Sequence, residues 1–195
     1  MSGGFLPKVT AHATVALLLF LLVAGCARAA THPLHRWRSR GMLLLVCLGA
    51  TGVRIHGLTM AGWWSGIVPG LSLPTLALLV HAGLRVSGHE GLFRSRDLRD
   101  LWWFGVLAGL LLYPAALGWG SWDPYAAGWS RSWVVLAAGA LCVLALLQDR
   151  RLGVVLVAAA VAWRLGLLES QNYWDYLLDP LFVLLALGMG ACLGM

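Results

Sequence analysis

The residues best suited to chemistry lie in the stretch ESQNYWDYLLDP, Glu169 to Pro180, which holds three acidic residues and no basic residue between two apolar runs. Asp179 followed by Pro180 is typical of a helix start, with a capping carboxylate and a proline in the first turn. Asp123-Pro124 repeats this pattern and predicts a cap for a short helix or turn over 124–129. Asp175 has no capping role in this scheme. It is therefore the residue of the stretch that we select as a candidate for catalysis or ligand binding.

Basic residues elsewhere could complete a site around this acidic stretch. The pairs that we expect are Arg164 with Glu169 and Arg54 with Asp175. The guanidinium fork of arginine binds phosphate or carboxylate, and His56 or Asp175 could move a proton on a lipid head group. The catalytic candidates are therefore His56 and Asp175, and the ligand-binding candidates are Arg54, Arg131, Arg164, Glu169, Asn172 and Asp175. A set of structural ion pairs is the simpler interpretation of the same residues.

The elements that would position these residues are long apolar blocks. Of 195 residues, 60% are hydrophobic and 11% charged, against about a quarter charged in soluble domains. The blocks predict an all-α, polytopic membrane helix bundle, one domain over 1–195, with about seven spans: 9–28, 41–58, 72–87, 101–119, 132–148, 152–168 and 180–194. Ten of the fourteen Lys and Arg residues fall in alternate loops, which predicts an N-terminus outside and a C-terminus in the cytoplasm.

The connections on the other side are rich in aromatic residues, which is typical of a membrane interface. Residues 171–178 predict a short amphipathic helix in that interface before the last span. Glycines and prolines in 57–74 exclude one continuous helix there, and leave open a re-entrant segment or an outer loop. Val23-Ala24-Gly25-Cys26 resembles a lipoprotein processing box, but we interpret the first apolar block as a span.

Several classes of function find no support in the sequence. The four cysteines are scattered without a metal-ligand spacing, so we expect no metal and no cofactor. The net charge of +6 comes from arginines in short loops, which does not favour a nucleic acid partner. No phosphate-binding loop, zinc-protease motif or nucleophile elbow occurs.

Three functional hypotheses remain, all set in the inner membrane of a bacterium. The first is a non-catalytic subunit or accessory protein of a larger envelope enzyme or transport complex, which contacts anionic lipids and a larger membrane protein. Its partner face would be rich in small residues, such as Gly188, Gly190, Ala191 and Gly194. The second is an enzyme acting at the outer leaflet on a lipid-linked or phosphorylated substrate through the Arg, His and Asp residues above. The third is a small anion transporter.

Overall fold

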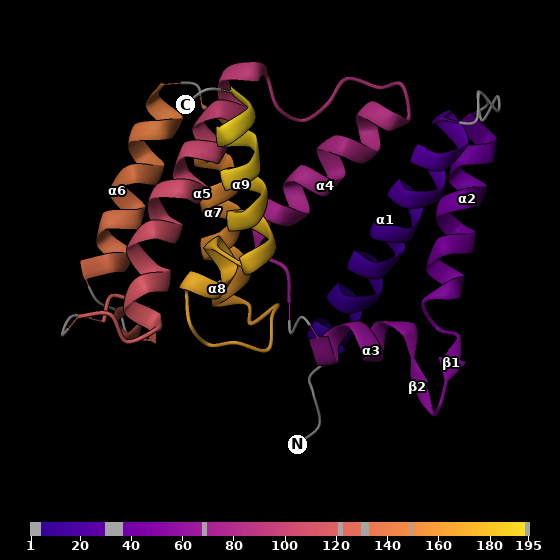
Figure 1. Cartoon of the computed structure of the whole chain (residues 1–195), viewed down its shortest axis with the longest axis horizontal. Helices are drawn as coiled ribbons and strands as arrows, with labels where there is room; N and C mark the ends of the chain where they lie inside the picture. The colour runs from indigo at the N-terminus through magenta and orange to yellow at the C-terminus, as the bar shows by residue number, and fades with distance from the viewer. Residues whose placement is uncertain are drawn as a thin grey trace. The chain divides into compact units, whose positions relative to one another are not determined.

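Helices make up most of the chain, and the apolar blocks determine where they form. The computed structural model describes residues 5–29, 37–67, 70–120, 123–129, 133–148 and 150–193. The contacts of the chain group into two compact units (Figure 1), which we call unit 1, Met1–Gly70 and Leu76–Leu92, and unit 2, Leu71–Thr75 and Phe93–Met195. The prediction of an all-α fold is confirmed, and that of a single domain stays a prediction.

Unit 1 is built around its first helix. Helix α1 (Phe5–Ala29) packs against α2 (Trp37–Ala50) and α3 (Met60–Ile67), and most of α4 (Leu73–Val86) also belongs to this unit. Phe20, Ala24 and Cys47 form a small core. Between α2 and α3 the chain forms a hairpin of two short antiparallel strands, β1 (Arg54–Ile55) and β2 (Leu58–Thr59).

Unit 2 contains two closely packed helix pairs. Helix α5 (Ser95–Ala116) packs against α9 (Pro180–Leu193), and α6 (Trp133–Leu147) packs against α7 (Arg151–Arg164). Two short elements lie in the connections: the 3₁₀ helix η1 (Ala126–Trp129) and helix α8 (Trp174–Leu177). Helices α5 and α9 approach closely because two glycines of α5, Gly105 and Gly109, face α9. A methyl group at Gly105 would lie 2.8 Å from the Cβ of Ala186.

The starts of α5 and α7 are joined by charged residues. Asp97 is fully buried and accepts a hydrogen bond from the Arg94 backbone N–H at 2.9 Å, which caps α5. It also accepts one from the Arg151 backbone N–H at 3.3 Å, while Arg150 forms an ion pair with Asp100 at 3.1 Å. The arginines of the α6–α7 turn, which the sequence suggests only as signals of membrane topology, thus hold α7 to α5.

The predicted membrane-spanning architecture is wrong. In the described part of the chain, no helix combines the length and the apolar content needed to cross a membrane. Helices α2, α4, α7 and α9 have 14 residues each, which makes them about 21 Å long against about 30 Å for a hydrocarbon core. The assignment of outside and cytoplasmic ends depended on those spans and is withdrawn with them.

The predicted spans nevertheless locate seven of the helices. The main difference is the predicted span 41–58, which ends as a helix at Ala50 and continues into the hairpin. His56 and Gly57 form the hairpin turn, and both have positive φ angles, 50° and 86°. The prediction that 57–74 is not one continuous helix is confirmed, because it contains β2, the eight-residue α3 and the segment that leads into α4.

Candidate functional site

The acidic stretch folds into a polar cluster in unit 2 that involves two connections, residues 123–129 and residues 168–179. Asp179 caps α9 through its Oδ1, which accepts a hydrogen bond from the Phe182 N–H at 2.9 Å. Its Oδ2 accepts hydrogen bonds from the Ser72 N–H at 2.8 Å and the Thr75 hydroxyl at 2.5 Å. The predicted cap is confirmed. The same carboxylate also joins α9 to the 71–75 segment, which no sequence pattern indicated.

The predicted cap at Asp123 is also confirmed. Its Oδ1 accepts hydrogen bonds from the backbone N–H groups of Tyr125, at 2.9 Å, and of Ala126, at 3.2 Å. This Asx turn leads the chain into η1. Asp123 is exposed, so its role is local, in contrast to that of the buried Asp179.

Asp175, the residue that we selected from the sequence, has a partner in the other connection. The Tyr125 hydroxyl donates a hydrogen bond of 2.8 Å to Asp175 Oδ1. Asn172 is fully buried beside this pair, and its amide group donates to the Tyr125 carbonyl oxygen at 3.0 Å and accepts from the Trp174 N–H at 3.0 Å. Asp175 and Asn172 are therefore bound into the connection between the two loops.

Hydrogen bonds to backbone carbonyl oxygens hold the two connections together. The Tyr173 N–H donates to the Gly128 carbonyl oxygen at 3.0 Å, and the Trp174 indole N–H donates to the Pro124 carbonyl oxygen at 3.0 Å. The backbone approach is so close that a methyl group on Gly128 would collide with the Asn172 side chain. Only glycine fits at position 128, because a side chain there has no space.

Three buried or half-buried tyrosines surround these carboxylates. Burial raises the pKa of Tyr113 to about 12, and the charges of Asp179 and Asp175 add to this effect. Burial, together with the hydrogen bond to Asp175, also raises the pKa of Tyr125, and burial is the main cause of the raised pKa of Tyr176. These phenols stay protonated at neutral pH and are poorly suited to act as bases, and the hydroxyls of Tyr125 and Tyr176 donate hydrogen bonds within the cluster.

The predicted interfacial helix over 171–178 is shorter than expected, because helical structure covers only Trp174–Leu177. Each face contributes one buried residue, Leu177 on the apolar side, 1% exposed, and Tyr176 on the polar side, 0% exposed, whereas Trp174 and Asp175 are half-buried. The Tyr176 hydroxyl accepts a hydrogen bond from the Leu168 N–H and donates to the Ser170 carbonyl oxygen, each at 3.1 Å. We expected the polar face to contact either water or the rest of the protein. The Tyr176 hydroxyl contacts the protein.

The remaining predicted site residues lie apart or outside the described residues. Arg131 is outside them. Arg164 and Glu169 are both exposed, and within the described chain they do not form the expected ion pair. Arg54 and His56 are exposed on the hairpin of unit 1, whereas Asp175 belongs to unit 2, so the pairing of Arg54 with Asp175 stays a prediction.

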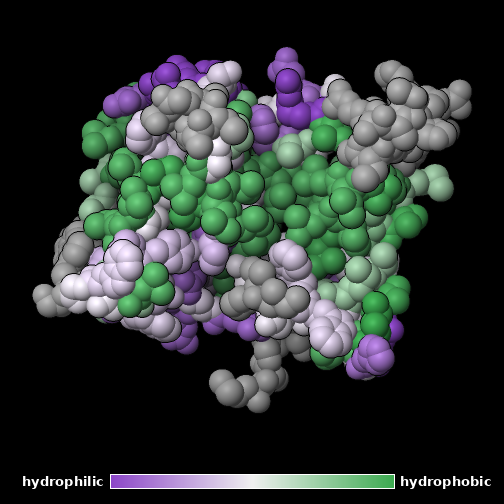
Figure 2. Space-filling model, in the orientation of Figure 1, coloured by the Kyte–Doolittle hydropathy of each residue, from purple (hydrophilic) through white to green (hydrophobic). Residues whose placement is uncertain are grey.

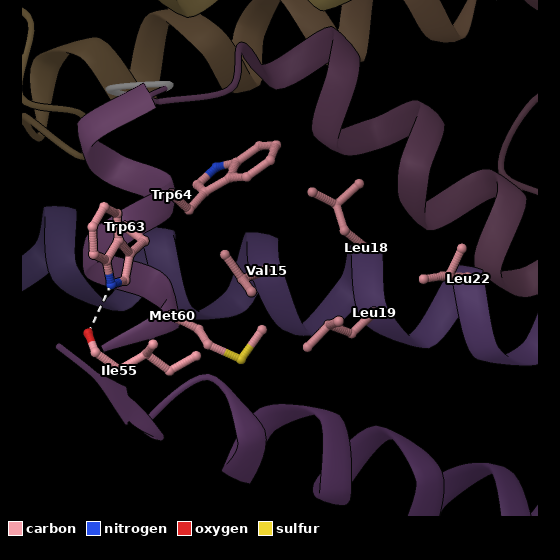
Figure 3. Close-up of a pocket in the computed structure, with 8 residues that line it drawn as sticks. All are labelled: Val15, Leu18, Leu19, Leu22, Ile55, Met60, Trp63 and Trp64. Carbon is pink, nitrogen blue, oxygen red and sulfur yellow. Dashed lines mark hydrogen bonds between the residues drawn. The ribbon is translucent and has the colours of Figure 1, made fainter. Parts of the chain in front are cut away.

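Sequence reasoning did not find an apolar pocket in unit 1 (Figure 3). Its volume is about 620 Å³, and eight residues from α1, the hairpin and α3 line it: Val15, Leu18, Leu19, Leu22, Ile55, Met60, Trp63 and Trp64. The four α1 residues follow the spacing of one helix face. That spacing is present in the sequence, but apolar residues also occupy the other faces of α1, so it does not stand out as a pattern.

Comparison with known proteins gives no relative for this chain: no family model, no curated protein and no solved structure matches it. The function of the protein is therefore inferred from its own contacts and surfaces.

Proposed function

We propose that this protein is a non-catalytic accessory subunit that works at a cell membrane and binds a larger protein through an exposed apolar face of α9. The observation that carries the proposal is the face itself, formed by Leu184, Leu185, Leu187, Gly188 and Met189, all exposed. Soluble monomers rarely leave a continuous apolar helix face uncovered, and such faces commonly mark interaction sites. We call these five residues the α9 face.

The position of the α9 face supports a role in binding, because α9 is already held in unit 2 by its other side. Phe182 and Ala186 are fully buried, and Val183 nearly so, where α9 meets α5. Leu184 and Gly188 point away from that contact, since residues two positions apart on a helix lie on opposite sides. A Cβ atom added at Gly188 would meet nothing within 4 Å. A partner could therefore approach α9 closely without disturbing the fold.

Apolar side chains are also exposed beyond α9. In the view of Figure 2, hydrophobic residues gather on the visible surface of both units. On α5 the exposed residues Trp103, Leu107, Leu110 and Leu111 follow helical spacing. This distribution favours an assembled or membrane-associated state over an isolated monomer in water.

The acidic cluster supports a non-catalytic role. Asp179, Asn172 and one oxygen of Asp175 are each engaged by protein hydrogen bonds. A general base needs a free acceptor within reach of a substrate proton. The hydrogen bonds of Asp179 and Asn172 therefore favour a structural role for these two residues, which is to hold the connections together.

The test is co-purification from the native host with a matched pair of variants. The tagged full-length chain would be purified under mild conditions, and the accompanying proteins quantified by mass spectrometry. Gly188→Trp fills the open position on the α9 face. Gly139→Trp, on α6, is the control, because Gly139 is also a helical glycine with nothing within 4 Å of an added Cβ.

We expect a stoichiometric partner with the wild-type chain and with Gly139→Trp, and its loss with Gly188→Trp at a melting temperature no lower than that of the wild type. Absence of any stoichiometric partner from the wild-type preparation would overturn the accessory role. Retention of the partner by Gly188→Trp, with loss in Gly139→Trp, would move the binding face from α9 to α6.

A further inference from the structure

We propose that the apolar pocket of unit 1 binds a single-chain anionic amphiphile, with its aliphatic chain in the pocket and its carboxylate or phosphate group at the hairpin that carries Arg54 and His56. This site is independent of the α9 face, because every residue that lines it belongs to unit 1. The proposal therefore stands or falls separately from the proposed accessory role.

The pocket has the size and chemistry of a site for an apolar ligand. Its volume, about 620 Å³, falls within the usual range for small-molecule sites, about 300–1,000 Å³. The lining is formed entirely by aliphatic, thioether and indole side chains. The indole N–H of Trp63 already donates to the Ile55 carbonyl oxygen at 2.9 Å, drawn as the dashed line in Figure 3. A polar ligand group in the pocket would lose its hydrogen bonds to water and would gain none from Trp63.

The shape of the pocket favours a chain over a compact ring system. Val15 and Leu22 are seven residues apart on α1, which extends the lining over about 10 Å of helix. Leu22, at one end of the lining, is 64% exposed, and the residues nearest the other end in Figure 3, around Val15, include two that are also exposed. Trp63, at 46%, and Ile55, at 48%, also reach the surface. An extended aliphatic chain fits a site that is elongated, apolar and open to solvent.

Charge at the hairpin specifies the other end of the ligand. Arg54 and His56 flank the lining residue Ile55, and both are exposed. No acidic residue occurs in the sequence before Glu90, whereas residues 1–70 contain six lysines and arginines. The basic residues near the pocket therefore have no carboxylate in the first 70 residues to neutralise them. An anionic head group supplies the missing charge, and the arginine fork binds carboxylate and phosphate alike.

The hairpin is held in a defined position, so the backbone of Arg54 and His56 lies at a fixed place relative to the pocket. The Trp63 bond to Ile55 ties β1 to α3, and the Met60 N–H donates to the Val53 carbonyl oxygen at 3.1 Å. The turn residues His56 and Gly57 have the positive φ angles of a tight two-residue hairpin. Chain and head group would thus be recognised by one local structure.

Photo-crosslinking tests the proposal on the full chain in the presence of phosphatidylcholine vesicles. The probe is hexadecanoate with a diazirine in its tail, and labelled peptides are mapped by mass spectrometry. We expect label on the peptides that contain Val15–Leu22 and Met60–Trp64. Competitors are unlabelled hexadecanoate, hexadecyl phosphate and the neutral hexadecanol. The two anions should compete severalfold better than the alcohol, and their order identifies carboxylate or phosphate as the preferred head group.

Two variant pairs separate chain binding from head-group binding. Leu18→Trp fills the pocket and should abolish labelling of its peptides, whereas Leu44→Trp, at an exposed position on α2, should leave labelling unchanged. Arg54→Gln should reduce the advantage of the anions by about threefold to fivefold, the size of one ion pair near the surface. Arg164→Gln, in unit 2, is its matched control.

Each contrary result overturns a defined part of the proposal. Label spread evenly over the exposed apolar helices, or label at the pocket that persists in Leu18→Trp, would show that the pocket does not select the chain. Equal competition by hexadecanol and hexadecanoate, or an unchanged preference in Arg54→Gln, would show that the hairpin does not recognise the charge.

Discussion

Replacing Asp179 by alanine should destabilise unit 2 by about 3 kcal/mol, because this carboxylate performs two tasks at once. It caps α9 by accepting from the Phe182 N–H, and loss of such a cap costs about 1 kcal/mol. It also accepts from the Ser72 N–H, which is buried, and an unsatisfied buried donor costs about 1–3 kcal/mol. Thr75 loses less, because the Ser72 hydroxyl oxygen is 3.2 Å from its own hydroxyl oxygen and can accept instead.

A second variant divides this cost between the two tasks. Asp179→Asn keeps one acceptor oxygen, and asparagine caps helices as well as aspartate does. Its amide N–H₂ group would then face the Ser72 N–H, where an acceptor is needed. We expect Asp179→Asn to retain the cap and lose the bond to the 71–75 segment, at a cost of about 2 kcal/mol. Asp123→Ala, which removes an exposed cap, is the control and should cost about 0.5–1 kcal/mol.

Thermal and denaturant unfolding followed by circular dichroism, under identical conditions for all four proteins, measures these differences. For a chain of 150–250 residues each kcal/mol corresponds to about 2–4 °C, so Asp179→Ala should melt about 6–12 °C below the wild type. An Asp179→Asn variant as stable as the wild type would refute the role assigned to the Ser72 bond. An Asp179→Ala variant no less stable than Asp123→Ala would refute the whole account.

The remaining predictions concern packing and pH. Gly105→Ala should lower the free energy of unfolding by about 1 kcal/mol, because the clash with Ala186 outweighs the better helix propensity of alanine. Gly188→Ala should raise it by about 0.5–1 kcal/mol, because the added methyl group meets no neighbour. Denaturant unfolding should therefore show changes of opposite sign for the two variants. Because the pKa of Tyr113 rises from 10 to about 12 on folding, its contribution to stability is complete below pH 10 and is lost as the pH rises from 10 to 12. Stability plotted against pH should therefore fall less steeply over this range in Tyr113→Phe, and an unchanged slope would contradict the assigned burial of the phenol.

Local patterns in the sequence were sufficient to predict the helices and their caps. Apolar blocks located seven helices, and the Asp-Pro pairs predicted caps at Asp123 and Asp179 that the structure confirms. These features depend on residues within a few positions of one another. The block 41–58 failed because apolar residues continue through the hairpin, and two-residue strands are too short to show an alternating pattern.

The contacts of the acidic cluster could not be predicted in the same way. Tyr125 lies 50 positions from Asp175, and Ser72 lies 107 positions from Asp179. No periodicity in a single sequence indicates such pairs. The Tyr125 hydroxyl, which donates to Asp175, was not indicated by the sequence, and the pairing of Asp175 with Arg54 stays a prediction. The membrane-spanning prediction failed for a related reason, since composition measures how apolar a segment is but not where its helix ends.

The glycines of helices α5 and α9 show why folding and partner binding should be separable. Gly105 and Gly109 of α5 lie four residues apart and receive Val183 and Ala186 of α9, so small residues are used there for contact within the chain. Gly188 has the same residue type in the same kind of helix, but it meets no neighbour. One side of α9 packs against α5 and the other side is exposed. A bulky residue at Gly188 should therefore remove a partner without lowering stability. A methyl group at Gly105 should lower stability while the α9 face keeps its shape. Variants at the two positions that changed both properties together would show that partner binding depends on the α5–α9 contact, and that the α9 face does not act alone.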